Sequence, residues 1–85
     1  MSPTEIALLA THKNYVLRVD RVCDEYLGIN YDRARRMAAL NRLPFPVFTM
    51  GESQKAPLLV TTKELADYID KTTEAARKAW AASQV

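Results

Sequence analysis

Four arginines lie close together in the stretch NYDRARRMAALNR, residues 30–42, and these are the side chains of the chain best suited to binding chemistry: Arg33, Arg35, Arg36 and Arg42. The stretch has one acidic residue, Asp32, so its net charge is +3, whereas the whole chain has a formal net charge of only +2. A guanidinium group offers a planar fork of donors that fits a phosphate or the O6/N7 edge of guanine. A local basic face on a nearly neutral protein indicates binding of a polyanion at one site; the alternative is an ordinary solvated helix face.

Other polar residues near this stretch are candidates for the same binding. Asn30 could pair with adenine or cap a helix, and Tyr31 could contact a phosphate or sugar or pack on its own helix. Arg42, at the far end, is better placed for a phosphate than for a base. In a later polar turn, Ser53, Gln54 and Lys55 could contact the minor groove or the DNA backbone, or form a solvated turn.

The composition argues against other functions. One cysteine and one histidine among 85 residues leave too few ligands for a zinc or iron site, and Cys23 falls on an apolar stripe, which favours a buried thiol. The sequence has no nucleophile–base pair, no phosphate loop and no paired carboxylates in an apolar setting, so we expect no enzyme and no cofactor. The longest apolar run at the N-terminus, residues 6–10, is too short for a signal peptide or a membrane span, which predicts a cytoplasmic protein.

Two short helices position the arginines. Apolar residues at helical spacing predict the first helix, with Asp20 as its N-cap and Gly28 as its left-handed C-terminal residue, and the stripe is Val19, Val22, Cys23, Tyr26 and Leu27. The second helix starts after Asn30, another good N-cap, and runs to Leu40. If the second helix buries Ala34, Met37 and Ala38, together with Leu43 after it, the arginines point away from the core. Two helices joined by so short a turn are typical of a helix-turn-helix.

The rest of the chain is predicted to support this pair. Ser2 and Glu5 form a capping-box pattern for a helix from Pro3 to about His12, with Ile6, Leu9 and Ala10 inward. β-Branched and aromatic residues predict strands at 15–18, 47–50 and 58–61, and the last two, joined by a polar turn at 51–57, would make a wing. Asn41 followed by two prolines ends the second helix.

Thr61 and Glu64 form a second capping-box pattern, which starts a final helix over about 62–82. Its outer half, rich in alanine, is longer than so small a domain needs, so it either projects or meets another subunit. We therefore expect an α+β fold, a winged helix-turn-helix in one domain over residues 1–85, with a short N-terminal helix, a small antiparallel sheet and a long C-terminal helix.

The assembled pattern resembles the winged-helix fold of small phage excisionases and of the MerR-type head. The segments Leu43 to Phe48, Ser53 to Lys55 and Leu65 to Asp70 are similar to the pyocin-activator family and to the Apl/Cox-type regulators of P2-like temperate phages. The similarity covers roughly residues 15–77. It implies a regulator in a bacterial host cell that binds double-stranded DNA at operators and attachment-site repeats, self-associates along DNA, and acts as a repressor and as an excisionase that bends DNA for integrase. One departure is Asn41, where many excisionase-like sequences have glycine.

Three hypotheses follow. The first is a sequence-specific phage regulator and excisionase, with integrase as a possible partner. The second has the same fold but activates transcription of a phage-tail bacteriocin gene cluster by recruiting RNA polymerase. The third, from another class, is a helical adaptor whose last helix binds a protein, the arginines being incidental.

Overall fold

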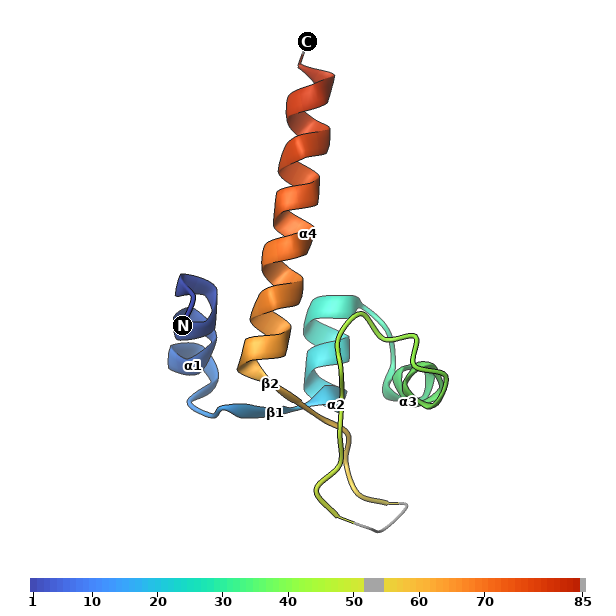
Figure 1. The fold of residues 1–85 in the computed structure, drawn as a ribbon. Coiled ribbons are helices and arrows are strands. Elements are labelled where there is room, and N and C mark those ends of the chain that lie inside the picture. Colours follow the sequence, from blue (N-terminus) through green and yellow to red (C-terminus); the bar gives the residue numbers. More distant parts are fainter. Residues whose placement is uncertain (52–54, 85) are drawn as a thin grey trace.

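The computed structural model describes residues 1–51 and 55–84. These residues form an α+β fold with four α-helices, a short π-helix and a two-stranded antiparallel sheet. In chain order the elements are α1 (Pro3–His12), β1 (Val16–Arg18), α2 (Val19–Val22), η1 (Cys23–Leu27), α3 (Tyr31–Ala39), β2 (Leu59–Thr61) and α4 (Thr62–Ser83). Figure 1 shows α1 and α2 on either side of the first turns of α4, with α3 beyond α2, and α4 then extends alone to the C-terminus.

The N-terminal helix α1 has the predicted bounds and cap but a different buried face. Ser2 accepts a hydrogen bond from the backbone N–H of Glu5 at 3.1 Å, as the capping pattern predicts. The prediction that Ile6, Leu9 and Ala10 face inward is wrong: Ile6 is 54% exposed, Ala10 is exposed and Leu9 is half-buried. The buried residues are Glu5 and Leu8, because α1 packs against α4, where Thr4 donates a hydrogen bond to the Asp70 carboxylate. Contacts with α4 therefore select the face.

The sheet pairs β1 with β2, with Leu17 opposite Val60. The predicted strand over 47–50 is reduced to one bridge, in which Phe48 and Leu59 exchange N–H to C=O bonds of 2.9 and 2.7 Å. Successive residues of a strand direct their hydrogen-bonding groups to opposite sides. Since β2 has three residues and its other side pairs with β1, only Leu59 offers both groups to Phe48. The third strand is thus a single pair.

The core is formed by residues of α2, η1, α3, β2 and α4, and its fully buried apolar residues include Val19, Val22, Cys23, Ala34, Val60 and Leu65. Two predictions for the first helix of the pair are wrong. Tyr26 is 39% exposed, because its hydroxyl lies 3.1 Å from Nε2 of His12 at the end of α1. Asp20 lies inside the helix instead of capping it: the N-cap is Arg18, which makes no side-chain capping bond, because β1 runs directly into the helix.

The final helix α4 has the predicted start and nearly the predicted end. Thr61 accepts a hydrogen bond from the N–H of Glu64 at 3.2 Å. Leu65 and Ala66 are buried, whereas every residue from Asp70 to Gln84 is exposed, so the outer half of the helix projects (Figure 1). Within the described parts of the chain, none of the helices has both the length and the apolar character needed to cross a membrane.

Candidate nucleic-acid interface

A tight turn sets the direction of α3. Gly28 has φ +67°, the left-handed conformation predicted for it, and its N–H donates to the carbonyl of Cys23. The next N–H, of Ile29, donates to the same carbonyl at 3.1 Å. The chain then enters α3 through Asn30, whose side-chain oxygen accepts from the N–H of Arg33 at 2.8 Å. The structure confirms Asn30 as the N-cap.

The two faces of α3 differ in burial and in charge. Ala34 is fully buried, Met37 and Ala38 are half-buried, and Leu43 after the helix is half-buried, as predicted. The opposite face exposes Asp32 and the three predicted arginines: Arg33, Arg35 and Arg36. The small buried side chain of Ala34 lets α3 approach α2 closely, and this contact turns the arginines toward solvent.

The exposed arginines are not all in the same environment. The guanidinium carbon of Arg35 lies 5.8 Å from the centroid of the Tyr31 ring, a cation–π distance that orients this side chain along the helix. For Arg33 and Arg36, no carboxylate within residues 1–51 and 55–84 comes within 4.0 Å of the guanidinium nitrogens. Two guanidinium groups on this face are therefore available to an external anion.

Arg18 shows the contrast. Its guanidinium donates hydrogen bonds to Asp20, the shortest at 3.0 Å, and this pairing lowers the pKa of the Asp20 carboxyl. Arg18 is thus paired within the chain, while Arg33 and Arg36 are exposed without such a partner among the described residues. The net positive charge of the chain lies on α3 and the residues just after it, since residues 30–42 carry +3.

Tyr31 has a structural contact that the sequence did not reveal. Its hydroxyl oxygen accepts a hydrogen bond from the N–H of Leu58 at 3.1 Å, and its ring is half-buried against the core. The bond joins the first turn of α3 to the residue just before β2, so it fixes the helix relative to the sheet. The predicted contact of Tyr31 with phosphate or sugar stays a prediction. No local sequence pattern could have identified this bond, because its partners are 27 residues apart.

The end of α3 returns the chain to the sheet through a left-handed residue. Asn41 has φ +54°, so it adopts the left-handed conformation that glycine usually supplies at the end of a helix and that asparagine can also take. The next N–H, of Arg42, donates to the carbonyl of Met37 at 2.8 Å, which places Arg42, exposed, beyond the last turn.

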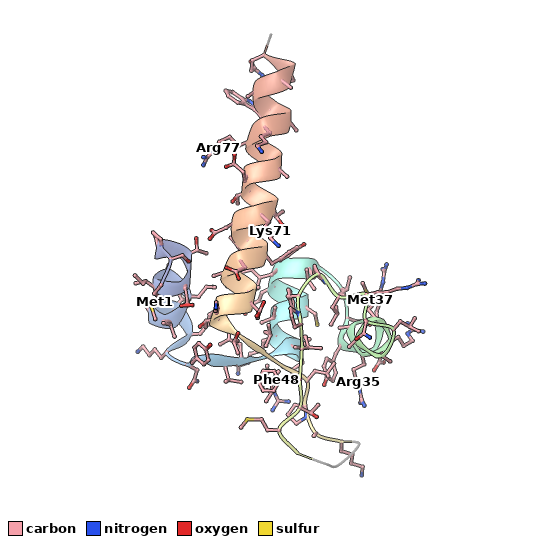
Figure 2. All side chains as sticks on the ribbon, viewed as in Figure 1. Met1, Arg35, Met37, Phe48, Lys71 and Arg77 are labelled. Atoms are coloured by element: carbon pink, nitrogen blue, oxygen red, sulfur yellow. The ribbon has the colours of Figure 1, made fainter. Side chains whose placement is uncertain are left out.

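A groove of about 340 Å³ separates α3 from the segment around Phe48 and is lined by Arg35, Ala38, Ala39, Val47, Phe48, Thr49 and Leu58. Figure 2 shows Arg35 and Phe48 on the side of the domain from which the segment after Phe48 projects, away from the free end of α4. Lys55 is exposed on the return of this segment, whereas Ser53 and Gln54 lie outside the described residues. α3 and the projecting segment thus form the walls of one concave, basic surface.

The described residues contain no group of three or more histidine, cysteine, aspartate or glutamate side chains arranged to hold a metal ion. Cys23 is buried, and burial raises the pKa of its thiol, so the thiolate is disfavoured in the folded protein. The arrangement is suited to binding through exposed guanidinium groups.

Comparison with known protein families gives one assignment. Residues 4–76 match the family described as pyocin activator protein PrtN. Neither the curated proteins nor the solved structures contain a match. The matched residues include the helix pair, β2 and the buried half of α4, so the similarity covers the whole basic surface together with the elements that position it. The chain therefore belongs to the pyocin activator protein PrtN family, a family of phage regulatory proteins.

Proposed function

We propose that the protein is a winged helix-turn-helix transcription activator that binds double-stranded DNA through α3. The observation that carries the proposal is the exposed arginine face of α3, in which Arg33 and Arg36 have no carboxylate partner among the described residues. A buried opposite face and a side-chain N-cap hold this helix rigidly. Membership of a family described as an activator supports the regulatory part of the proposal.

In this proposal α3 is the recognition helix and lies in the major groove. The N-terminal part of such a helix meets base edges, while its far end and the flanking loops contact phosphates. Arg33 and Arg36 are in the first two turns and reach base edges, with Arg35 held beside Tyr31 for a phosphate or a base. Arg42, beyond the last turn, contacts a phosphate.

The wing is the segment on either side of the Phe48–Leu59 pair, residues 47–51 and 55–61. It lies across the groove from α3, so a duplex seated on α3 brings its next groove to the wing. Lys55, with the predicted partners Ser53 and Gln54, would contact the backbone there. A backbone contact of this kind contributes affinity on all DNA sequences alike.

The activator hypothesis is preferred to the other two. The adaptor hypothesis leaves the charge segregation on α3 without a role, whereas DNA binding uses it. The excisionase and repressor hypothesis, with integrase as a partner, rests on the resemblance alone and stays a prediction, which an excision assay with integrase would test. Self-association along DNA and recruitment of RNA polymerase also stay predictions, and the exposed outer half of α4 is the surface to examine for both.

The test is a gel shift with promoter DNA from the source genome in the presence of competitor DNA, combined with a promoter–reporter measurement in cells. Arg36→Ala is expected to weaken binding to the specific site by about 1–3 kcal/mol if Arg36 reads a base, and to lower reporter output in parallel. Lys55→Ala is expected to weaken binding to specific and random duplexes by equal factors.

The matched control is Lys71→Ala, which removes one exposed charge from α4, away from α3 (Figure 2). It should leave DNA affinity in the gel shift unchanged. Unaltered DNA affinity in both the Arg36→Ala and the Lys55→Ala variants would show that α3 is not a recognition helix. If the wild-type protein shifts the promoter DNA specifically but lowers reporter output, the protein binds DNA as a repressor and not as an activator.

A further inference from the structure

An unusually exposed apolar side chain lies on the proposed wing. Met50 is 79% exposed, and Phe48, two residues earlier, is 37% exposed beside the groove that α3 lines with Arg35. Large apolar side chains on a surface that binds a polyanion need a reason, because water solvates them poorly and phosphates give them no partner.

The backbone beneath these side chains is held firmly. Phe48 exchanges two backbone hydrogen bonds with Leu59, of 2.9 and 2.7 Å, and Leu59 in turn pairs with Arg18 in β1. Beyond this pair the hydroxyl of Thr49 donates to the carbonyl of Gly51 at 3.4 Å, across Met50. Met50 is therefore carried just beyond the last sheet contact, on a segment anchored to the sheet.

Other large apolar side chains are also strongly exposed, but they lie elsewhere: Met1 precedes α1, Ile6 is on α1 and Leu40 is the C-cap of α3. Trp80 is near the free end of α4, which extends away from the projecting segment (Figure 1). Met50 lies on the projecting segment, directly after Phe48 and Thr49, which line the groove of about 340 Å³ together with Arg35. An apolar side chain on a projecting segment that also carries a lysine, Lys55, has the composition of a minor-groove wedge.

We propose that Met50 inserts from the minor groove between two stacked base pairs and kinks the duplex next to the site read by α3. The inference rests on the proposed DNA-binding function and adds to it a residue that deforms DNA. Proteins that enter the minor groove often insert Met, Leu, Ile or Phe in this way, while nearby cations hold the backbone. Lys55, on the return of the same segment, supplies a cation.

The wedge also predicts a sequence preference without a hydrogen bond to any base. Pyrimidine–purine steps such as TA and CA/TG unstack most readily, whereas A-tracts are stiff. The protein should therefore prefer a flexible step at the wing-facing flank of its site. A thioether side chain tolerates either base pair at that step, since it is long, flexible and polarizable.

The experiment uses the full chain and duplexes that carry 2-aminopurine, a base whose fluorescence rises when it unstacks, at successive positions of the protected flank. Wild-type protein is expected to raise the fluorescence several-fold at one step and to shorten the end-to-end distance of a doubly labelled duplex. Met50→Ala should abolish both signals while its affinity for the site falls no more than about tenfold. Met50→Leu, which keeps nearly the same side-chain volume, should restore them.

The matched control is Ile6→Ala, which removes an exposed apolar side chain from α1 and should change neither signal. A fluorescence rise that persists in Met50→Ala, or specific binding by wild-type protein with no rise at any position, would overturn the wedge and leave DNA binding intact. Absence of any DNA binding by wild-type protein would overturn the proposed function and the wedge together. Loss of reporter activation in Met50→Ala with an unchanged duplex bend would also overturn the wedge, and would indicate that Met50 contacts a protein.

Discussion

The salt dependence of DNA binding gives a quantitative test of the basic surface. The basic surface carries five exposed cations: Arg33, Arg35, Arg36, Arg42 and Lys55. Each phosphate neutralised on B-DNA releases counterions and contributes about −0.9 to the slope of log affinity against log salt. If all the cations contact phosphates, the slope is about −4.5, and raising salt from about 50 to 200 mM lowers the affinity about 500-fold.

Arg42→Ala is the sharpest perturbation, because Arg42 lies beyond the end of α3, where a phosphate contact is expected. The slope should become shallower by about 0.9, and the fall in affinity over the same salt range should shrink to about 150-fold. Specific and random duplexes should lose affinity by the same factor at any one salt concentration. If some arginines contact bases instead of phosphates, the wild-type slope is shallower. The difference between the wild-type and Arg42→Ala slopes is still about 0.9.

The assay is fluorescence anisotropy of a labelled duplex, titrated at four or more salt concentrations, with Lys71→Ala as the control for charge removed elsewhere. A wild-type slope near zero would refute electrostatic binding to DNA through this surface. Equal slopes for Arg42→Ala and wild type would remove Arg42 from the interface, and a slope change in Lys71→Ala would show that net charge alone sets the effect.

Three further outcomes are expected. Tyr31→Phe leaves the N–H of Leu58 without its acceptor and should lower the free energy of unfolding by about 1 kcal/mol in urea denaturation, whereas Tyr15→Phe, at an exposed ring, should not. Because burial raises the pKa of the Cys23 thiol, the folded protein should resist alkylation that is rapid in denaturant, and this thiol's contribution to stability should be lost as pH rises through its folded-state pKa; rapid alkylation of native protein, followed by mass spectrometry, would contradict this. Truncation after Asp70 should spare binding to one site but weaken loading of adjacent sites in a gel shift, and unchanged cooperativity would exclude α4 from self-association.

The features that the sequence predicted correctly are those with local causes. The caps at Ser2, Asn30 and Thr61 each use a side chain three residues from its backbone partner, so the pattern in the chain is sufficient. Gly28 and Asn41 adopt left-handed conformations for the same kind of local reason. The exposed arginine face of α3 likewise follows from helical spacing once Ala34 is taken as buried.

The features that were missed depend on contacts between distant segments. The buried face of α1, which carries Glu5 and Leu8, is selected by packing on α4 and not by the apolar spacing within α1. The short third strand follows from the three-residue length of β2, and Tyr26 is drawn outward by His12. The bond between Tyr31 and Leu58, which positions α3, joins two residues whose types alone give no sign of it.

The direct passage from β2 into α4 has a consequence for the arrangement of sites on DNA. No loop separates Thr61 from the helix, and the N–H of Thr62 donates to the carbonyl of Tyr15 at 2.8 Å, so the free end of α4 keeps a fixed direction relative to α3. The exposed half of α4, at about 1.5 Å per residue, holds whatever binds it roughly 20 Å from the domain. If the protein's DNA site is moved along the duplex, a partner bound to the exposed half of α4 changes its position around the duplex axis. Displacing the site by about five base pairs should place the partner on the opposite side of the DNA, and a full turn of about ten should bring it back.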